Sequence, residues 1–454
     1  MWSCGRVALV SQHAGPCPVI KSIIEQRTHL QANLTPQRGG SRSALSVSRR
    51  MPLFFLAILL LSTYPGQSQL PGSAPPEGAP ASASSSEKKP PPRRAYVGDA
   101  VCRSCHQEKV KTYFGTAHHL ASYWPGEHPI SGDFTPGSNI FQTANQYLHF
   151  EMSATKDGYF QTAVEELGPS KTISRTERIA VIAGAARKGQ SYLFWKGDTL
   201  FQLPVTYWTE RNSWGNSPGY PDGSPRFDRA IVPRCLECHG SYFEWLPPPV
   251  NRYNKTSLVL GIWCEKCHGP GREHVARNRS KSPPRPGSNA EAIVNPASLS
   301  RDRQMDVCAL CHSGAATPIQ PSLSFLPGDV LDDYIINLQY AKEDTPVDVH
   351  ASQVQLLMKS RCFKSSTTLA CTTCHDVHTQ QRDAASFSPH CLTCHQSKDC
   401  GRYAKLGDQI ARNCIDCHMP RQETQAIFSN SNGKKFRPLV RNHRIAIYPD
   451  AQPQ

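Results

Sequence analysis

The stretch that decides the fold is Cys264-Glu265-Lys266-Cys267-His268, followed by Gly269-Pro270-Gly271-Arg272-Glu273-His274. Two cysteines three positions apart, with a histidine directly after the second, form the attachment sequence of a c-type haem. The thiols form thioethers with the vinyl groups of the porphyrin, and the histidine becomes the proximal ligand of the iron. The stretch therefore predicts a covalent haem with His268 as its axial ligand.

The same pattern occurs seven times, and we number the copies in chain order as motifs 1 to 7. The motifs are Cys102–His106, Cys235–His239, Cys264–His268, Cys308–His312, Cys371–His375, Cys391–His395 and Cys414–His418. The predicted thioether cysteines are Cys102, Cys105, Cys235, Cys238, Cys264, Cys267, Cys308, Cys311, Cys371, Cys374, Cys391, Cys394, Cys414 and Cys417. The predicted proximal ligands are His106, His239, His268, His312, His375, His395 and His418. Zinc or disulfide sites also use paired cysteines, but they have no need of a histidine after each pair. The sequence thus predicts seven covalently bound c-type haems (heme c), each with its iron.

The composition provides few apolar residues for a core made of side chains alone. Of 454 residues, 38% are hydrophobic, and the chain contains 38 prolines and 30 glycines. A chain of this length normally buries more apolar surface, so porphyrins are expected to take the place of side chains in the interior. We therefore predict a mainly α fold with many loops, a multihaem cytochrome c packed around seven covalent haems, with a small antiparallel β insert.

The chain divides by composition into four segments. Residues 1–50 lack a domain pattern and are interpreted as a start-site artefact or a non-native leader. Residues 51–69 are predicted to be a signal peptide, because the apolar run Leu53–Leu61 is too short to span a bilayer. Residues 70–95, rich in Pro, Ser and Ala, are predicted to be a disordered tether, and residues 96–454 the heptahaem domain.

The β insert is expected within residues 129–230, in the 133-residue interval that separates the starts of motifs 1 and 2. Alternating apolar residues on both sides of Asp157-Gly158 predict one hairpin, and residues 190–195 and 199–207 predict a second. The aromatic residues expected in its core are Trp195, Tyr207, Trp208 and Trp214.

Further histidines are available as distal ligands on the opposite side of each iron. The nine that lie outside the motifs in the haem domain are His118, His119, His128, His149, His274, His350, His378, His390 and His443. We predict ligation by His118, His274, His350, His378, His390 and His443. Two histidines on one iron leave no open position and suit electron transfer, whereas a vacant position permits chemistry on a small molecule. The function therefore depends on how many irons have a second histidine.

Charge and the remaining cysteines leave other questions open. The formal net charge is +14, and residues 1–100 contribute +7 of it, from 11 Lys and Arg against 4 Asp and Glu. The basic residues are scattered, which argues against nucleic-acid binding; we expect part of them to neutralise haem propionates. Outside the motifs, Cys362 and Cys400 either form a disulfide or remain two separate thiols.

The chain resembles multihaem cytochromes c of the cytochrome c-552/c-554 type, which include the tetrahaem electron acceptor of hydroxylamine oxidoreductase. The residues that carry the resemblance are motif 1 with His118, Cys264–His274, Cys371–His378, and Cys414–Pro420 with His443. The resemblance covers roughly residues 96–445 and implies closely spaced haems that exchange electrons. Seven motifs and the β insert depart from the tetrahaem pattern, which puts the partner and the substrate in doubt.

The sequence predicts an exported electron carrier, in the periplasm or at the cell surface, with mostly bis-His haems and redox partner proteins. No catalytic residue is assigned, no transmembrane helix is expected in the mature chain, and association with a membrane surface stays open. The alternative function is a multihaem oxidoreductase acting on a small nitrogen or sulfur compound at one five-coordinate haem. A conductive filament is the third alternative.

Overall fold

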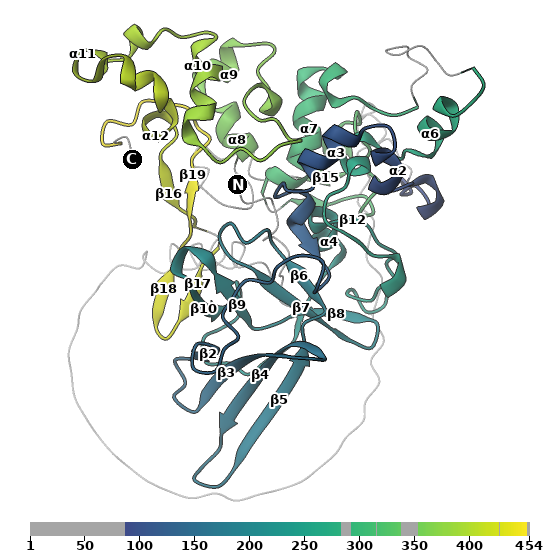
Figure 1. Cartoon of the computed structure of the whole chain (residues 1–454), viewed down its shortest axis with the longest axis vertical. Coiled ribbons are helices and arrows are strands. Elements are labelled where there is room, and N and C mark those ends of the chain that lie inside the picture. Colours follow the sequence, from purple (N-terminus) through teal and green to yellow (C-terminus); the bar gives the residue numbers. More distant parts are fainter. Residues whose placement is uncertain (1–86, 283–291, 315, 337–352, 426, 452–454) are drawn as a thin grey trace, which may run out of the picture. The chain divides into compact units, whose positions relative to one another are not determined.

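The computed structural model describes residues 87–282, 292–314, 316–336, 353–425 and 427–451 (Figure 1). The predicted leader, the signal peptide, most of the tether and His350 lie outside these residues. The end of the expected tether contacts the body of the protein. The backbone N–H of Lys88 donates to Gln320 at 2.9 Å, and its ammonium donates to the hydroxyl of Tyr334 at 2.9 Å.

The α-helices are short, and most of them coincide with the motifs or flank them. They are α2 (Asp99–Arg103), α3 (Gln107–Tyr113), α4 (Pro233–His239), α5 (Cys264–His268), α6 (Arg272–Asn278), α7 (Arg301–His312), α8 (Gln353–Met358), α9 (Arg361–Ser365), α10 (Ser388–Leu392), α11 (Tyr403–Leu406) and α12 (Cys414–His418). Gly269 ends α5 with a φ of +80°, a conformation that glycine adopts without steric cost. Helices of five to seven residues are unstable alone, so these depend on what packs against them.

Two antiparallel sheets fill much of the interval between motifs 1 and 2. The first has the order β2 (Ile140–Gln142), β3 (Leu148–Thr155), β4 (Gly158–Glu166) and β5 (Thr172–Arg178). The second has the order β1 (Ser122–Tyr123), β6 (Val181–Ala183), β7 (Ser191–Lys196), β8 (Thr199–Gln202) and β11 (Arg229–Ala230). The two tight hairpins, β3–β4 and β7–β8, turn at Lys156-Asp157 and Gly197-Asp198. Both turns lie where the alternation of apolar residues predicts them.

The other strands form two-stranded pairs. They are β9 (Val205–Trp208) with β10 (Ser213–Asn216), β12 (Gly240–Tyr242) with β13 (Val259–Leu260), β14 (Thr317–Pro318) with β15 (Ile335–Ile336), β16 (Arg421–Glu423) with β19 (Leu439–Arg441), and β17 (Ser429–Ser431) with β18 (Lys434–Phe436). The backbone N–H of Asn216 donates to the hydroxyl of Ser431 at 3.1 Å. Residues near the C-terminus therefore join the strand region that precedes motif 2.

The expectation of a mainly α fold is wrong. The structure is 30% helical and 23% strand, and its strands form several antiparallel sheets. The physical reason lies in local sequence. Apart from motif 4, which ends the 12-residue helix α7, each motif has only one or two helical turns before a glycine or an irregular segment. The interval before motif 2 is rich in aromatic and β-branched residues that favour strands.

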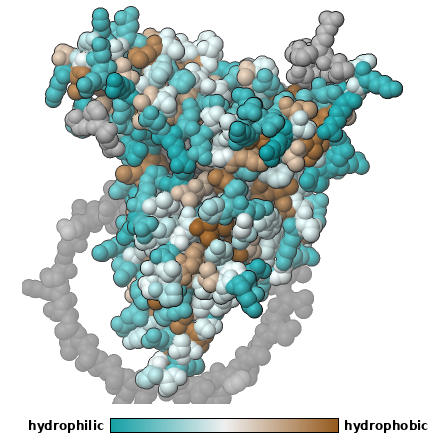
Figure 2. Space-filling model, in the orientation of Figure 1, coloured by the Kyte–Doolittle hydropathy of each residue, from teal (hydrophilic) through white to brown (hydrophobic). Residues whose placement is uncertain are grey.

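The apolar core is divided among separate clusters. One cluster lies in the sheets and contains Phe150, Tyr192 and Trp214, all at most 7% exposed. Another surrounds α7 and contains Met305, Leu310 and Phe363. The face in Figure 2 is largely hydrophilic and carries separate apolar patches. In the part of the chain that the structure describes, no helix combines the length and the apolar character needed to cross a bilayer.

Candidate haem-binding sites

Backbone carbonyls fix the orientation of several motif histidines. The Nδ1 atoms of His239, His268 and His418 lie 2.9, 2.8 and 2.9 Å from the carbonyl oxygens of Ala121, Val294 and Ala446, respectively. A carbonyl only accepts, so each Nδ1 carries the proton that it donates. The lone pair then lies on Nε2, which is the arrangement of a metal-binding histidine held by an outer-shell partner.

Within the described residues, four motif histidines face a second histidine from another part of the chain. His274 faces the proximal histidine of motif 1, His378 that of motif 3, His118 that of motif 4 and His443 that of motif 5. The ring centres are 6.4 Å apart for His106–His274, 6.1 Å for His268–His378, 6.1 Å for His118–His312 and 6.3 Å for His375–His443.

These separations fit one metal ion between each pair of rings. A metal–imidazole bond is about 2.0 Å long and the ring centre lies about 1.2 Å beyond the nitrogen, so two rings on opposite sides of one metal are about 6.4 Å apart. Stacked rings in direct contact are closer, as His119 and Phe114 are at 4.3 Å. The four pairs thus leave the space that a haem iron requires, and the residues present fit bis-His coordination.

Burial favours the neutral form in several of the paired imidazoles, and the neutral form is the one that binds a metal ion. It lowers the pKa of His118 and His312 to about 4 and that of His375 to about 3. Burial also lowers the pKa of His268 and His443. A neutral imidazole has a lone pair for a metal ion, whereas an imidazolium has none.

The other histidines have different surroundings. His390 lies in α10 beside motif 6, and in the described residues no second histidine ring faces it or His395 or His418. His119 lies 3.9 Å from Asp99 and stacks on Phe114. His128 packs edge-on against Tyr123, with ring centres 5.1 Å apart, and its ring centre lies 6.3 Å from that of His119. His149 lies 3.2 Å from Glu151 in β3.

Three pairs of motifs touch through their first cysteines. The thiol groups of Cys102 and Cys264, of Cys308 and Cys371, and of Cys391 and Cys414 interact directly. Cys362 and Cys400 form no disulfide with each other and are two separate thiols in the structure. The contacts place motif 1 beside motif 3, motif 4 beside motif 5, and motif 6 beside motif 7.

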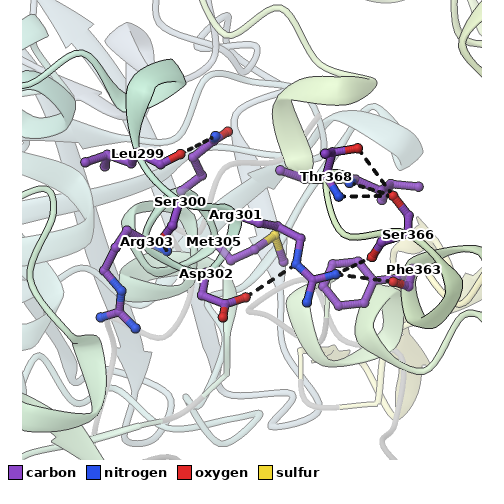
Figure 3. A network of polar contacts seen from close by, with 12 residues as sticks. Leu299, Ser300, Arg301, Asp302, Arg303, Met305, Phe363, Ser366 and Thr368 are labelled. Carbon is purple, nitrogen blue, oxygen red and sulfur yellow. Dashed lines mark hydrogen bonds and ion pairs between the residues drawn. The ribbon is translucent and has the colours of Figure 1, made fainter.

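Arg301, the first residue of α7, ties motif 4 to the segment that leads into motif 5 (Figure 3). Its guanidinium donates to the carbonyls of Phe363 and Ser366 and lies over the Phe363 ring at 4.6 Å from the centre. Met305, one turn along α7, has its sulfur 3.6 Å from the thiol of Cys371. These contacts hold the two motifs in register with each other.

Buried carboxylates inside the motifs are residues that our sequence reasoning missed. Glu237, Glu265 and Asp416 occupy the positions between the two cysteines of motifs 2, 3 and 7, and are 3%, 5% and 7% exposed. Glu265 accepts hydrogen bonds from the backbone N–H groups of residues 97, 98 and 271 at 2.7 to 2.8 Å. The signal in the sequence is an acidic residue between the two cysteines of a motif.

The other two carboxylates bind arginines. Arg441 donates to Asp416 at 2.7 Å and to the carbonyls of Ile415 and Met419 at 2.9 and 3.0 Å. Arg234 donates to Glu237 at 2.6 Å. Each motif acid is therefore compensated by fixed donors, which permits an ionised carboxylate in a buried position.

A family model described as "Cytochrome c554 and c-prime" matches residues 210–269, which contain motifs 2 and 3. The crystal structure of the outer cell wall cytochrome OcwA is 15% identical to the chain. That alignment covers 74% of this chain and 79% of OcwA, with a TM-score of 0.48. An undecahaem cytochrome from the S-layer of Carboxydothermus ferrireducens is 15% identical over 73% of this chain and 52% of its own, with a TM-score of 0.35. No curated protein matches the chain.

Proposed function

We propose that this chain is an exported c-type cytochrome that binds seven haems covalently and carries electrons between redox partner proteins. The observation that carries the proposal is the set of four histidine pairs with ring centres 6.1 to 6.4 Å apart. The seven repeated motifs and the family match over motifs 2 and 3 support it. When bound, the haems supply reversible one-electron chemistry at iron.

The protein's own residues attach, orient and space the cofactors. The motif cysteines would provide the thioethers, and the paired histidines would ligate four of the irons. The distal histidines also join motifs: His274, which follows motif 3, reaches motif 1, and His378, which follows motif 5, reaches motif 3. His118 and His443 connect two more segments to motifs 4 and 5. Together with the three thiol contacts, this arrangement favours closely spaced cofactors at motifs 1 and 3 to 7.

The proposed location outside the cytoplasmic membrane follows from the chemistry of attachment. Haem is joined to such motifs on the outer side of that membrane, so the motifs require export. For this chain we propose an exported position, at the periplasmic or extracellular side.

Electron paramagnetic resonance and resonance Raman spectra of the purified ferric protein test the proposal. We expect low-spin signals for the irons of the four histidine pairs and no change of these signals on addition of nitrite or hydroxylamine. A high-spin signal from any of those four irons would contradict the bis-His assignment. A high-spin signal that shifts with an added small molecule would instead favour the oxidoreductase function.

A further inference from the structure

A buried ion pair joins motif 2 to motif 4. Arg234 directly precedes Cys235, and Glu237 lies between the two cysteines of motif 2; they are 9% and 3% exposed. Nη1 of Arg234 donates to Oε2 of Glu237 at 2.6 Å, and Nη2 donates to the carbonyl of Leu310 inside motif 4. Oε1 of Glu237 accepts the backbone N–H of Leu323 at 2.8 Å. The pair thus connects α4, α7 and the loop after α7.

The guanidinium of Arg234 lies close to the cysteines of two motifs. Arg234 lies within electrostatic range of Cys238 and Cys311, the second thioether cysteines of motifs 2 and 4. An arginine keeps its proton in proteins, so the positive charge is permanent. Inside a protein, where the dielectric constant is low, such a charge acts more strongly on its neighbours than it does in water.

A contribution to folding stability does not by itself explain why this ion pair is buried. Removing two ions from water costs several kcal/mol each, and apolar residues of similar volume often stabilise a fold as well as a buried pair does. Motif 3 compensates its buried carboxylate with backbone N–H groups and uses no arginine for it. Motif 7 uses an arginine, but the side chain of Arg441 is 19% exposed, against 10% for Arg234, so solvent screens its charge more.

We propose that Arg234 and Glu237 are positioning residues that set the reduction potentials of the two irons attached at motifs 2 and 4. The inference rests on the proposed function, because it requires haems at both motifs. Reduction adds one electron to an iron site, so the charge of Arg234 favours the reduced state and the charge of Glu237 opposes it. The hydrogen bond of Arg234 to Leu310 and that of Leu323 to Glu237 fix both charges relative to the two motifs.

Single and double neutral substitutions separate the two charges. We expect Arg234→Gln to lower the potentials of two of the seven redox components, and Glu237→Gln to raise the same two. The double variant, which removes both charges, is expected to return those potentials toward their wild-type values. Optical redox titration of the whole haem-loaded protein, with redox mediators at constant pH, measures all three. Arg175→Gln, which removes an exposed arginine paired with Glu177, is the matched control and should change no potential.

The outcomes distinguish this inference from the proposed function. Intact mass reports how many haems each variant carries, independently of any potential. If the wild type carries no covalent haem, the proposed function fails. If all variants carry the wild-type number of haems and their potentials do not move, or move in the same direction, the inference is overturned while the proposed function stands. If Arg234→Gln does not accumulate, Glu237→Gln and the double variant still test the inference. The two reduction potentials must then be higher in Glu237→Gln than in the double variant.

Discussion

Which ring nitrogen carries the proton determines which nitrogen of a histidine is available to a metal ion. Nδ1 of His443 lies 3.1 Å from the carbonyl of Arg441, which leaves Nε2 for the metal that the facing ring of His375 would share. Burial lowers the pKa of both imidazoles, so they are neutral at physiological pH. A distal ligand of this kind is a single side chain whose loss opens one iron.

Replacing His443 by alanine is therefore expected to convert one iron from low spin to high spin. About one seventh of the ferric signal should move to high-spin positions, because only the iron of motif 5 loses a ligand. Electron paramagnetic resonance of the purified variant measures this. His149→Ala is the matched control, since His149 lies in β3 and pairs with Glu151. Identical spectra for His443→Ala and the wild type would contradict the assignment.

The buried carboxyl of Asp99 leads to a second prediction about a single residue. Asp99 is 3% exposed and accepts the backbone N–H of Cys264 at 3.0 Å; burial raises the pKa of its carboxyl. A raised native pKa means that the folded state favours the protonated form, so this stabilisation is present at low pH and is lost as pH rises through the native pKa. Asp99→Asn keeps the acceptor and removes the charge.

The free energy of unfolding of Asp99→Asn relative to wild type should therefore increase between about pH 4 and pH 7. Urea denaturation of both proteins over this range provides the measurement. A difference between the two proteins that does not change with pH would refute a raised pKa for Asp99.

At the scale of elements, contacts between motifs matter more than the helices themselves. α5 and α12 have five residues each, so neighbouring segments must hold them in place. The contact of Arg301 with the segment before motif 5 is one such support (Figure 3).

Arg301→Gln is expected to destabilise the protein by about 2 kcal/mol, because it removes charge-assisted hydrogen bonds and a cation–π contact. Chemical denaturation measures the loss. Arg226→Gln, which breaks an exposed ion pair with Asp228, should change stability by less than about 0.5 kcal/mol. An equal effect of the two substitutions would mean that the network around α7 contributes no specific stability.

Replacing a core residue of the strand region is expected to destabilise the protein more than Arg301→Gln does. Trp208, at the end of β9, is 1% exposed and packs with Leu356, Ile427 and Val440, which lie far from it in the sequence. Trp208→Ala should cost about 3–5 kcal/mol through lost burial and an unfilled cavity. Denaturation would report this loss, and a cost below about 1 kcal/mol would show that the site collapses around the smaller side chain.

The sequence predicted an element well where the residues that determine it are close together in the chain. The hairpins β3–β4 and β7–β8 follow from alternation around Asp157 and Asp198, because a tight turn fixes its own register. The proportions of helix and strand were not predicted correctly, because we assigned the interior to haems and expected only a small β insert. The strands β17 and β18 are short and polar, and their contact with β10 depends on chain distant in sequence.

At the scale of the whole molecule, the motifs themselves could be read directly and their pairing could not. Which histidine meets which motif depends on contacts between segments separated by up to 194 positions, as from His118 to His312. No periodicity encodes such a contact. The arginine partners of Glu237 and Asp416 were missed for a related reason, because an acidic residue on a short helix is ordinarily solvated.

Intact mass spectrometry of the denatured purified protein shows whether all seven motifs carry haem. Thioether bonds survive denaturation, so we expect the mass of the processed polypeptide plus seven haems. A mass that corresponds to fewer haems, or to the polypeptide alone, would contradict it.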